Sequence, residues 1–310
     1  MSSPKPPDTF GNRTKKDFFK NWQVYLILLP VVIYFIIFAY VPMVGLTMAF
    51  QQFNIHRGWM DSPWVGFQHF TDFFSSHHFN RILRNTFLIS LYDLLLNFPA
   101  PIIFALLLNE LRNIKFKRVV QTISYMPFFI SLVVITGLIR DFFNSTGPMT
   151  QLISFLGGPS GNLLGQPGMF RGIFVGTNLW QNIGFSSIIY VAALAGVDQE
   201  QYEAARLDGA SRLRQIWHIT LPGIRPTITI LLILRLGALL SVGFERIILL
   251  YSPAVYETAD VINSFVFRRG LIENDFSFAT AVGLFNSVVS LVLILAANYI
   301  SRKVGETSLF

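Results

Sequence analysis

The chain contains no cysteine, and this excludes disulfide bonds, cysteine metal sites and thiol catalysis. It is also poor in charge, because only 13% of its 310 residues are Asp, Glu, Lys or Arg, whereas a soluble domain has about 25%. Hydrophobic residues make up 52% of the sequence, 31 residues are phenylalanine, and the mean hydropathy is +0.51. Low charge combined with long apolar runs is typical of an integral membrane protein.

Several chemical signatures are absent as well. The sequence has no GxxxxGK[ST] nucleotide-binding loop, so it does not bind ATP in that way. The histidines show no metal-ligand spacing; they are His56, His69, His77, His78 and His218. An intramembrane enzyme would need paired catalytic groups at one depth, and no convincing pair is present. We therefore expect neither an enzyme nor a metal site.

Six segments have the length and composition of membrane spans, since a bilayer core needs about 20 predominantly apolar residues per helix. They cover about 23–50, 85–108, 119–139, 172–196, 227–250 and 276–300. We predict helices, because a lipid-exposed open strand would leave backbone groups without hydrogen bonds. The expected fold is an all-α integral membrane protein, with a polar tail at 1–22 and one transmembrane domain at 23–310.

The basic residues indicate the orientation of these spans. The net charge is +7, and most of the 24 lysines and arginines lie in the tail, in 109–118, in 197–225 and after 300. Basic residues between apolar spans favour membrane orientation over binding of nucleic acid. The positive-inside rule then places both termini and the loop 197–225 in the cytoplasm. The first apolar run is too long for a signal-peptide core, so we expect an uncleaved first span.

The stretch "EAARLDGASRLRQIWHITLP", residues 203–222, is a charged loop between two apolar spans. We predict two short helices, with Gly209 at a positive φ between them and Ser211 capping the second. Pro222 is expected to end the second helix. Its apolar stripe is Leu213, Ile216 and Trp217. Such a helix either rests on lipid headgroups or docks in a groove of a cytoplasmic partner.

This stretch resembles the EAA loop of binding-protein-dependent ABC importer permeases. The positions that match the spacing of that motif are Glu203, Ala204, Ala205, Asp208, Gly209, Ala210, Ile219, Leu221 and Pro222. Ile216 stands where the motif usually has Phe, a swap of similar volume. The resemblance implies that the loop is a coupling helix seated in a cleft of an ATPase subunit, and that these residues and Ile216 form the ATPase-coupling site.

The resemblance extends through "RNTFLISLYDLLLNFPAPIIFALLLNELR", "YMPFFISLVVI" and "GFERIILLYSPAVYETADVINSFVFRRGL", which are similar to the LplB-like subgroup of MalF-type sugar permeases. It implies the six-span type I importer fold, import of oligo- or polysaccharides and residence in the bacterial inner membrane among lipids. The implied partners are a second permease with an EAA loop, two ATPase subunits and an extracytoplasmic solute-binding protein. ATP and Mg²⁺ would be bound by the ATPase subunits, so this chain itself needs no cofactor.

Polar residues inside the spans are candidates for a substrate path, because intramembrane charges face the bundle interior or a water-filled cavity. Asp93 and Arg235 either pair with each other or line a sugar path. Similarity to the maltose permease implies six further path positions: Gln181, Asn182, Leu234, Gly237, Ala238 and Ser241.

Leu234, Gly237 and Ala238 offer little hydrogen bonding through their side chains, so Arg235 is expected to supply it. A guanidinium pairs well with a carboxylate, and this makes an acidic sugar, such as alginate or another oligouronate, an alternative to a neutral one. A proton-coupled secondary transporter with Asp93 as the proton carrier is the rival hypothesis, and it leaves the EAA loop unexplained.

Overall fold

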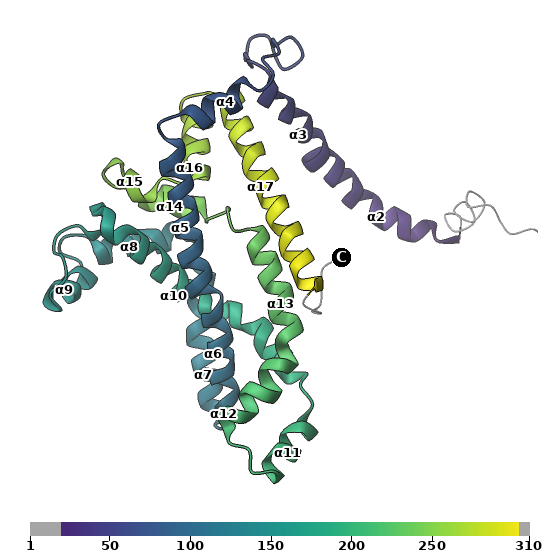
Figure 1. The fold of residues 1–310 in the computed structure, drawn as a ribbon, viewed down its shortest axis with the longest axis vertical. Coiled ribbons are helices and arrows are strands. Elements are labelled where there is room, and N and C mark those ends of the chain that lie inside the picture. Colours follow the sequence, from purple (N-terminus) through teal and green to yellow (C-terminus); the bar gives the residue numbers. More distant parts are fainter. Residues whose placement is uncertain (1–19, 304–310) are drawn as a thin grey trace, which may run out of the picture.

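The structure is a computed structural model, which describes residues 20–303 as helices joined by turns, without a strand in that range (Figure 1). Four segments of it are long and apolar enough to cross a membrane: Trp22–Phe50, Phe79–Glu110, Arg212–Gly237 and Phe276–Lys303. Two bent pairs bring the number of spans to six if each pair counts as one: Ile114–Phe129 with Leu132–Phe143, and Pro167–Ala195 with Gln199–Leu207.

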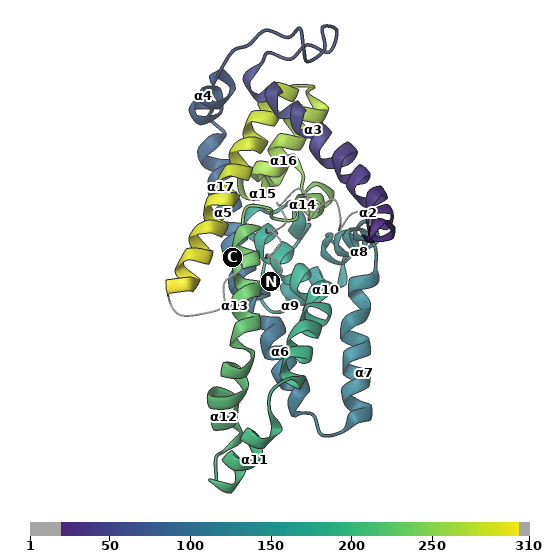
Figure 2. The same cartoon turned by 90° about the vertical axis from the view of Figure 1, so that its right-hand side faces the viewer.

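The first span stands apart from the other helices (Figures 1 and 2). It consists of α2 (Trp22–Phe35), a π-helical turn (Ile36–Tyr40), α3 (Val41–Met43) and a 3₁₀ turn (Val44–Phe50). No residue of α2 is buried, and only the 3₁₀ turn packs closely against the last helix of the chain. Most of the tail expected at 1–22 lies outside the described residues.

The second span runs along the long axis of the molecule, and the sixth span lies in its upper half (Figure 1). The elements concerned are α4 (Gln68–Ser75), α5 (Phe79–Asn97), α6 (Pro99–Glu110), α16 (Ile262–Phe267) and α17 (Phe276–Lys303). Pro99 occupies the first turn of α6, where its missing N–H costs no helical hydrogen bond. A buried hydrophobic cluster joins α4, α5, α16 and α17; its members are Phe73, Ile82, Ile262, Phe265, Phe278 and Val282.

The third span is not the single helix expected over 119–139. It consists of α7 (Ile114–Tyr125), a 3₁₀ turn (Met126–Phe129) and α8 (Leu132–Phe143), bent by 99° at the break. Pro127 lies at the start of the 3₁₀ turn, and both Ile130 and Ser131 are extended. The Ser131 hydroxyl then accepts the Val134 N–H at 3.4 Å and caps α8. Proline followed by a capping serine ended one helix and started another.

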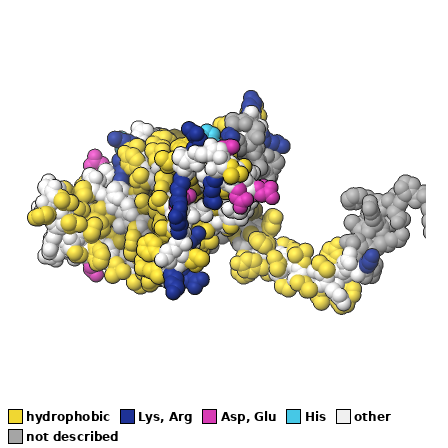
Figure 3. Space-filling view, turned by 90° about the horizontal axis from the view of Figure 1, so that it is seen from below, with side chains coloured by type: hydrophobic (Ala, Val, Ile, Leu, Met, Phe, Trp, Pro, Cys, Tyr) yellow, Lys and Arg dark blue, Asp and Glu magenta, His cyan; other side chains and the backbone are white. Residues whose placement is uncertain are grey.

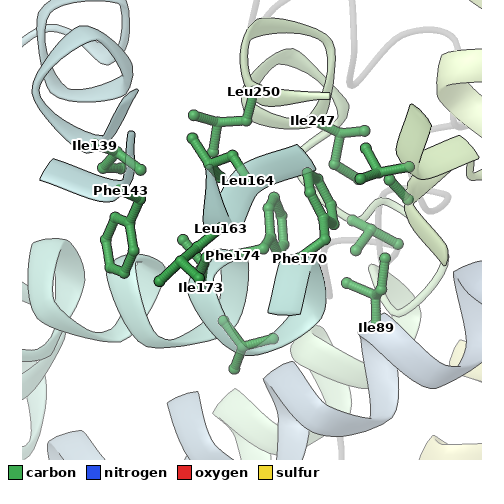
Figure 4. Close-up of a cluster of buried hydrophobic side chains, with 14 of the residues drawn as sticks. Ile89, Ile139, Phe143, Leu163, Leu164, Phe170, Ile173, Phe174, Ile247 and Leu250 are labelled. Atoms are coloured by element: carbon green, nitrogen blue, oxygen red, sulfur yellow. The ribbon is translucent and has the colours of Figure 1, made fainter. Parts of the chain in front are cut away.

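The largest buried cluster holds α8 against α10 (Pro167–Ala195) and α14 (Phe244–Leu250) (Figure 4). α9 (Pro148–Phe155) and a 3₁₀ turn (Leu163–Gly165) connect α8 to α10. Cluster members shown in Figure 4 include Ile139, Phe143, Leu163, Phe170, Phe174, Ile247 and Leu250. The short helix α14 is thereby fixed in position from one side by packed apolar side chains.

The fifth span begins earlier than the expected 227–250 and also ends earlier. α11 (Gln199–Leu207) is followed by α12 (Arg212–Gln215), a π-helical turn (Ile216–Thr220) and α13 (Leu221–Gly237).

Pro222 does not end the helix, and that prediction is wrong. The Leu221 N–H bonds to the Ile216 carbonyl five residues back. Pro222 then sits in the first turn of α13, where a proline is tolerated. The helix stops at Gly237, a turn follows over 238–243, and Gly243, with φ of 60°, starts α14.

Charged groups join the ends of α5, α15 (Tyr256–Ala259) and α16. Asp260 follows α15, is fully buried, and pairs with Arg268 at 2.7 Å and Arg81 at 3.3 Å. Burial alone would lower the pKa of Arg268, but its hydrogen bond to Asp260 and the charge of that carboxylate raise the pKa above its usual value. Burial and the nearby Arg81 lower the pKa of His78.

Candidate functional site: an intramembrane cavity and a coupling loop

A cavity of about 700 Å³ lies between α5, α6, α10, α13 and the turn before α14. Its polar lining comes from several helices: Ser90, Asp93, Asn97, Asn178, Asn182, Ser186, Arg235, Ser241 and Arg246. Aromatic side chains, among them Phe98, Phe174 and Phe185, form part of the remaining wall. A polar site between helices with an apolar wall fits a small organic ligand with several hydroxyl groups.

Asp93 and Arg235 pair with each other in this cavity. One carboxylate oxygen of Asp93, Oδ2, accepts a hydrogen bond from the Arg235 guanidinium. The other, Oδ1, accepts from Asn97 at 2.5 Å and from Asn178 at 2.7 Å. Both carboxylate oxygens of Asp93 are therefore occupied by donors. This arrangement opposes the rival in which Asp93 is a free proton carrier.

A second arginine, Arg246, also lines the cavity and is absent from the site residues that the sequence predicted. Its residue exposure is 5%. One terminal nitrogen donates to the side-chain oxygen of Gln181, while Nη1 has no partner among the described residues. Gln181 in turn makes a long hydrogen bond, 3.5 Å, to the Ile130 carbonyl at the break of the third span. The signal in the sequence was the pair of charges Glu245 and Arg246 directly before the apolar run "IILL".

Five of the eight predicted path residues line the cavity: Asp93, Asn182, Arg235, Ala238 and Ser241. Gln181 is buried next to it and contacts it through Arg246. Leu234 and Gly237 are not part of the lining, so the structure does not support their place in the path. A Cβ on Gly237 would lie 2.8 Å from Ile294 of α17. Arg235 and Ala238 share one face of α13, and that register turns Gly237 toward α17 instead.

The loop 197–225 has the turn that the sequence predicted. Gly209 has φ of +73°. The Ala210 N–H bonds to the Ala205 carbonyl at 2.8 Å, and the Gly209 N–H bonds to Arg206 at 3.1 Å. These two bonds form a Schellman motif, which closes the end of α11. The Ser211 hydroxyl accepts the Arg214 N–H at 3.4 Å and caps α12, so both local predictions are confirmed.

Apolar side chains at the tip of this loop are left uncovered. Leu207 is 90% exposed, Leu213 71% and Trp217 68%, whereas Ile216 is half-buried. Figure 3 shows Lys and Arg side chains gathered on the same end of the molecule. Of the motif residues, Glu203, Ala204, Asp208, Gly209 and Pro222 are exposed, while Ala205, Ala210, Ile219 and Leu221 are half-buried.

The base of the loop is joined firmly to the helices. The Tyr202 hydroxyl donates to Thr220 at 2.9 Å, linking α11 to the start of α13. Arg212 pairs with Glu110 at the end of α6, also at 2.9 Å. Leu221 packs against a buried cluster of α6, α10 and α13. An exposed apolar tip on a rigid base is suited to docking a partner.

Comparisons with known proteins identify the class. Residues 73–306 match the family described as binding-protein-dependent transport system inner membrane component. The chain is 45% identical over 288 residues to protein LplB of Bacillus subtilis (strain 168), covering 93% of this chain and 91% of that protein. The polygalacturonan/rhamnogalacturonan transport system permease protein YteP of the same organism is 42% identical over 288 residues, covering 93% and 90%.

Solved structures agree with this result. A chain in the crystal structure of a bacterial ABC transporter involved in the import of the acidic polysaccharide alginate is 46% identical, with a TM-score of 0.87. The match covers 94% of this chain and 99% of that one. A second structure is of a bacterial alginate ABC transporter with an alginate pentasaccharide-bound periplasmic protein, at 45% identity and the same TM-score, covering 95% and 99%.

This chain therefore belongs to the binding-protein-dependent transport system inner membrane component family. It is a permease subunit of an ABC importer, a transport protein rather than an enzyme. The nucleotide chemistry of such a system belongs to a separate ATPase. Among residues 20–303, no group of three or more His, Cys, Asp or Glu side chains is placed to hold a metal ion.

Proposed function

We propose that this chain is one of two permease subunits in an ATP-driven importer of acidic oligo- or polysaccharides. In this proposal the cavity is part of the sugar path, and the loop 197–225 docks in a cleft of an ATPase subunit. The observation that carries the proposal is the continuous helical segment Arg212–Gly237. The coupling residues lie at one of its ends, and Arg235, which lines the cavity, lies near the other. A movement imposed on the loop is therefore transmitted along one helix to the cavity wall.

The lining of the cavity supports a sugar as the substrate. Asn and Ser side chains donate to and accept from hydroxyl groups, and the described charged groups in the lining are Asp93, Arg235 and Arg246. Two guanidinium groups against one carboxylate leave an excess of positive charge, which favours an anionic sugar. The similar proteins support this choice, since one is named for polygalacturonan and another for alginate, an acidic polysaccharide.

The first span supports the presence of a second permease. Its helix α2 has no buried residue, and apolar side chains cover its surface (Figure 3). In the proposed complex, part of that surface contacts the second permease with its own EAA loop, and the rest faces lipid. Two ATPase subunits bind ATP and Mg²⁺, and an extracytoplasmic solute-binding protein delivers the sugar to the end of the molecule that carries α4 and α16.

Both termini are proposed to lie in the cytoplasm together with the coupling loop. The positive-inside rule supports this topology, because basic residues gather around the loop end of the molecule (Figure 3). Fusing a reporter that is active only in the cytoplasm to either terminus would check this placement.

The function is tested by reconstituting the whole complex in proteoliposomes, with ATP inside and binding protein loaded with an oligouronide outside. We expect uptake that requires both ATP and the binding protein, with vesicles containing ADP as the control. Uptake driven by a pH gradient without ATP would contradict the proposal and favour proton coupling. Uptake of neutral oligosaccharides alone would contradict the proposal of an acidic substrate. The assignment of the chain as a permease would still hold.

A further inference from the structure

The two arginines that line the cavity, Arg235 and Arg246, differ in their hydrogen-bond partners. Arg235 pairs with Asp93, the one carboxylate in the described lining of the cavity. Both oxygens of Asp93 already accept hydrogen bonds, from Arg235, Asn97 and Asn178. Arg246 contacts a neutral amide, Gln181. Arg246 is therefore the guanidinium of the cavity lining that has no carboxylate in hydrogen-bond contact.

The position of Arg246 is fixed by its surroundings. α14 begins at Gly243, whose φ of +60° sets the direction of the helix. Ile247 and Leu250, on the same short helix, are buried in the largest core cluster (Figure 4). Arg246 has only 5% of its surface exposed, so it cannot extend toward bulk water. Its Nη1 atom lacks a partner in the described structure, and the residue lines the cavity.

A buried guanidinium whose hydrogen-bond partner is a neutral amide is unfavourable, because its charge has lost water and has no carboxylate in contact. The cost is removed when an anion enters the cavity. A carboxylate is well suited, since it accepts two parallel hydrogen bonds from the guanidinium fork. Asn182 and Ser241 line the same cavity and offer hydrogen bonds to neighbouring hydroxyls of a sugar ring.

We propose that Arg246 is the residue that binds the carboxylate of a uronate unit in the cavity, whereas the Arg235–Asp93 pair serves to hold α5 and α13 together. This inference rests on the proposed transport of an acidic saccharide, and it names the residue that favours acidic over neutral sugars. Because this preference arises in the permease cavity, it adds to any preference of the solute-binding protein.

The test uses the complete importer with its binding protein in proteoliposomes. Two substrates of equal length are compared: an oligouronide and the same oligomer with its carboxyl groups converted to methyl esters. The affinity of the binding protein for each is measured separately, so that its own preference can be divided out. The variants are Arg246→Gln and Arg246→Lys. The matched control is Arg171→Gln, because Arg171 is an arginine of α10 that bonds to Asn85 and Thr258 outside the cavity lining.

We expect Arg246→Gln to lower kcat/KM for the oligouronide about tenfold to a hundredfold relative to the ester, the range for losing hydrogen bonds to a charged group. Arg246→Lys should keep part of the preference. Arg171→Gln should leave the preference unchanged. The thermal midpoint of the Arg246→Gln complex should equal or exceed that of the wild type, because removing an unpaired buried charge relieves a cost.

Two results would overturn the inference. An equal loss of kcat/KM for both substrates in Arg246→Gln would show that the Arg246 charge does not bind the carboxylate of the sugar. Failure of Arg246→Gln to assemble, when Arg246→Lys assembles without any preference for the oligouronide, would show that Arg246 serves assembly and not substrate selection. Absence of ATP-dependent oligouronide uptake in the wild-type complex is a different outcome, since it would refute the proposed function itself.

Discussion

At Gly209 the backbone has φ of +73°, and no atom lies within 4 Å of the place where a Cβ would be. A substitution there acts through backbone conformation and not through a clash. Gly209→Val should abolish most of the stimulation of ATPase activity by the binding protein, because a β-branched residue is strongly disfavoured at positive φ. Gly209→Asn is the matched control and should be tolerated, since Asn visits this region readily. Normal stimulation in the Val variant would show that this turn is not needed to couple ATP hydrolysis to transport.

The Asp93–Arg235 pair gives a second prediction. Arg235→Leu leaves the largely buried carboxylate of Asp93 without its cationic partner, and an unpaired buried charge is unfavourable. The variant complex should dissociate during purification. The double variant Arg235→Leu, Asp93→Leu should assemble again, because neither charge is left alone. Size-exclusion chromatography of the solubilised complex distinguishes the two. A single variant that assembles like the wild type would mean that the pair does not hold the helices.

Residues whose conformation depends on their neighbours in sequence were predicted well. The positive φ of Gly209 and the cap by Ser211 need only the adjacent turn. The contact of Arg246 was not predicted, because its partner, Gln181, is 65 positions away in the sequence. The charge state of the cavity depends on which carboxylate reaches which guanidinium. Spacing within one helix cannot determine that.

Helix contacts place a strict limit on size at one position of α10. A Cβ on Gly184 would overlap the Ser124 carbonyl and lie 2.9 Å from the Tyr125 nitrogen. Gly184→Ala should therefore separate α10 from α7 and destabilise the fold by about 1–3 kcal/mol. Gly176→Ala on the same helix is the control, because no atom lies within 4 Å of that position. It should stabilise slightly through helix propensity. Thermal midpoints of the two complexes in detergent give the comparison, and equal midpoints would contradict the close approach.

Proline interrupts one helix of this chain and leaves another continuous. Pro127 lies at the end of a helix, where the next residues become extended and the span bends by 99°. Pro222 lies just after a π-helical turn, and the helix continues through it. Sequence reasoning located the apolar segments from composition. It did not locate the break, because whether neighbours satisfy the freed carbonyls is decided by packing.

At the scale of the whole molecule, the isolated first span carries a further prediction. A chain in which no residue of α2 is buried should depend on another subunit for its assembled form. Produced alone, it should be recovered in low yield and as mixed species, whereas production with the second permease should give one homogeneous species. Light scattering of the purified samples measures the difference. A stable, monodisperse and transport-competent single chain would contradict the proposed pair of permeases.

The continuous segment Arg212–Gly237 also has a simple mechanical consequence. With 26 residues and a rise of about 1.5 Å per residue, it is a lever roughly 39 Å long. A tilt of about 10° imposed at the coupling loop would displace the far end sideways by about 7 Å, on the same geometry. That displacement is about the width of a sugar ring. If an ATPase docks on this loop as proposed, we expect a small rotation of it to move the wall that bears Arg235 far enough to open or close a path for the sugar.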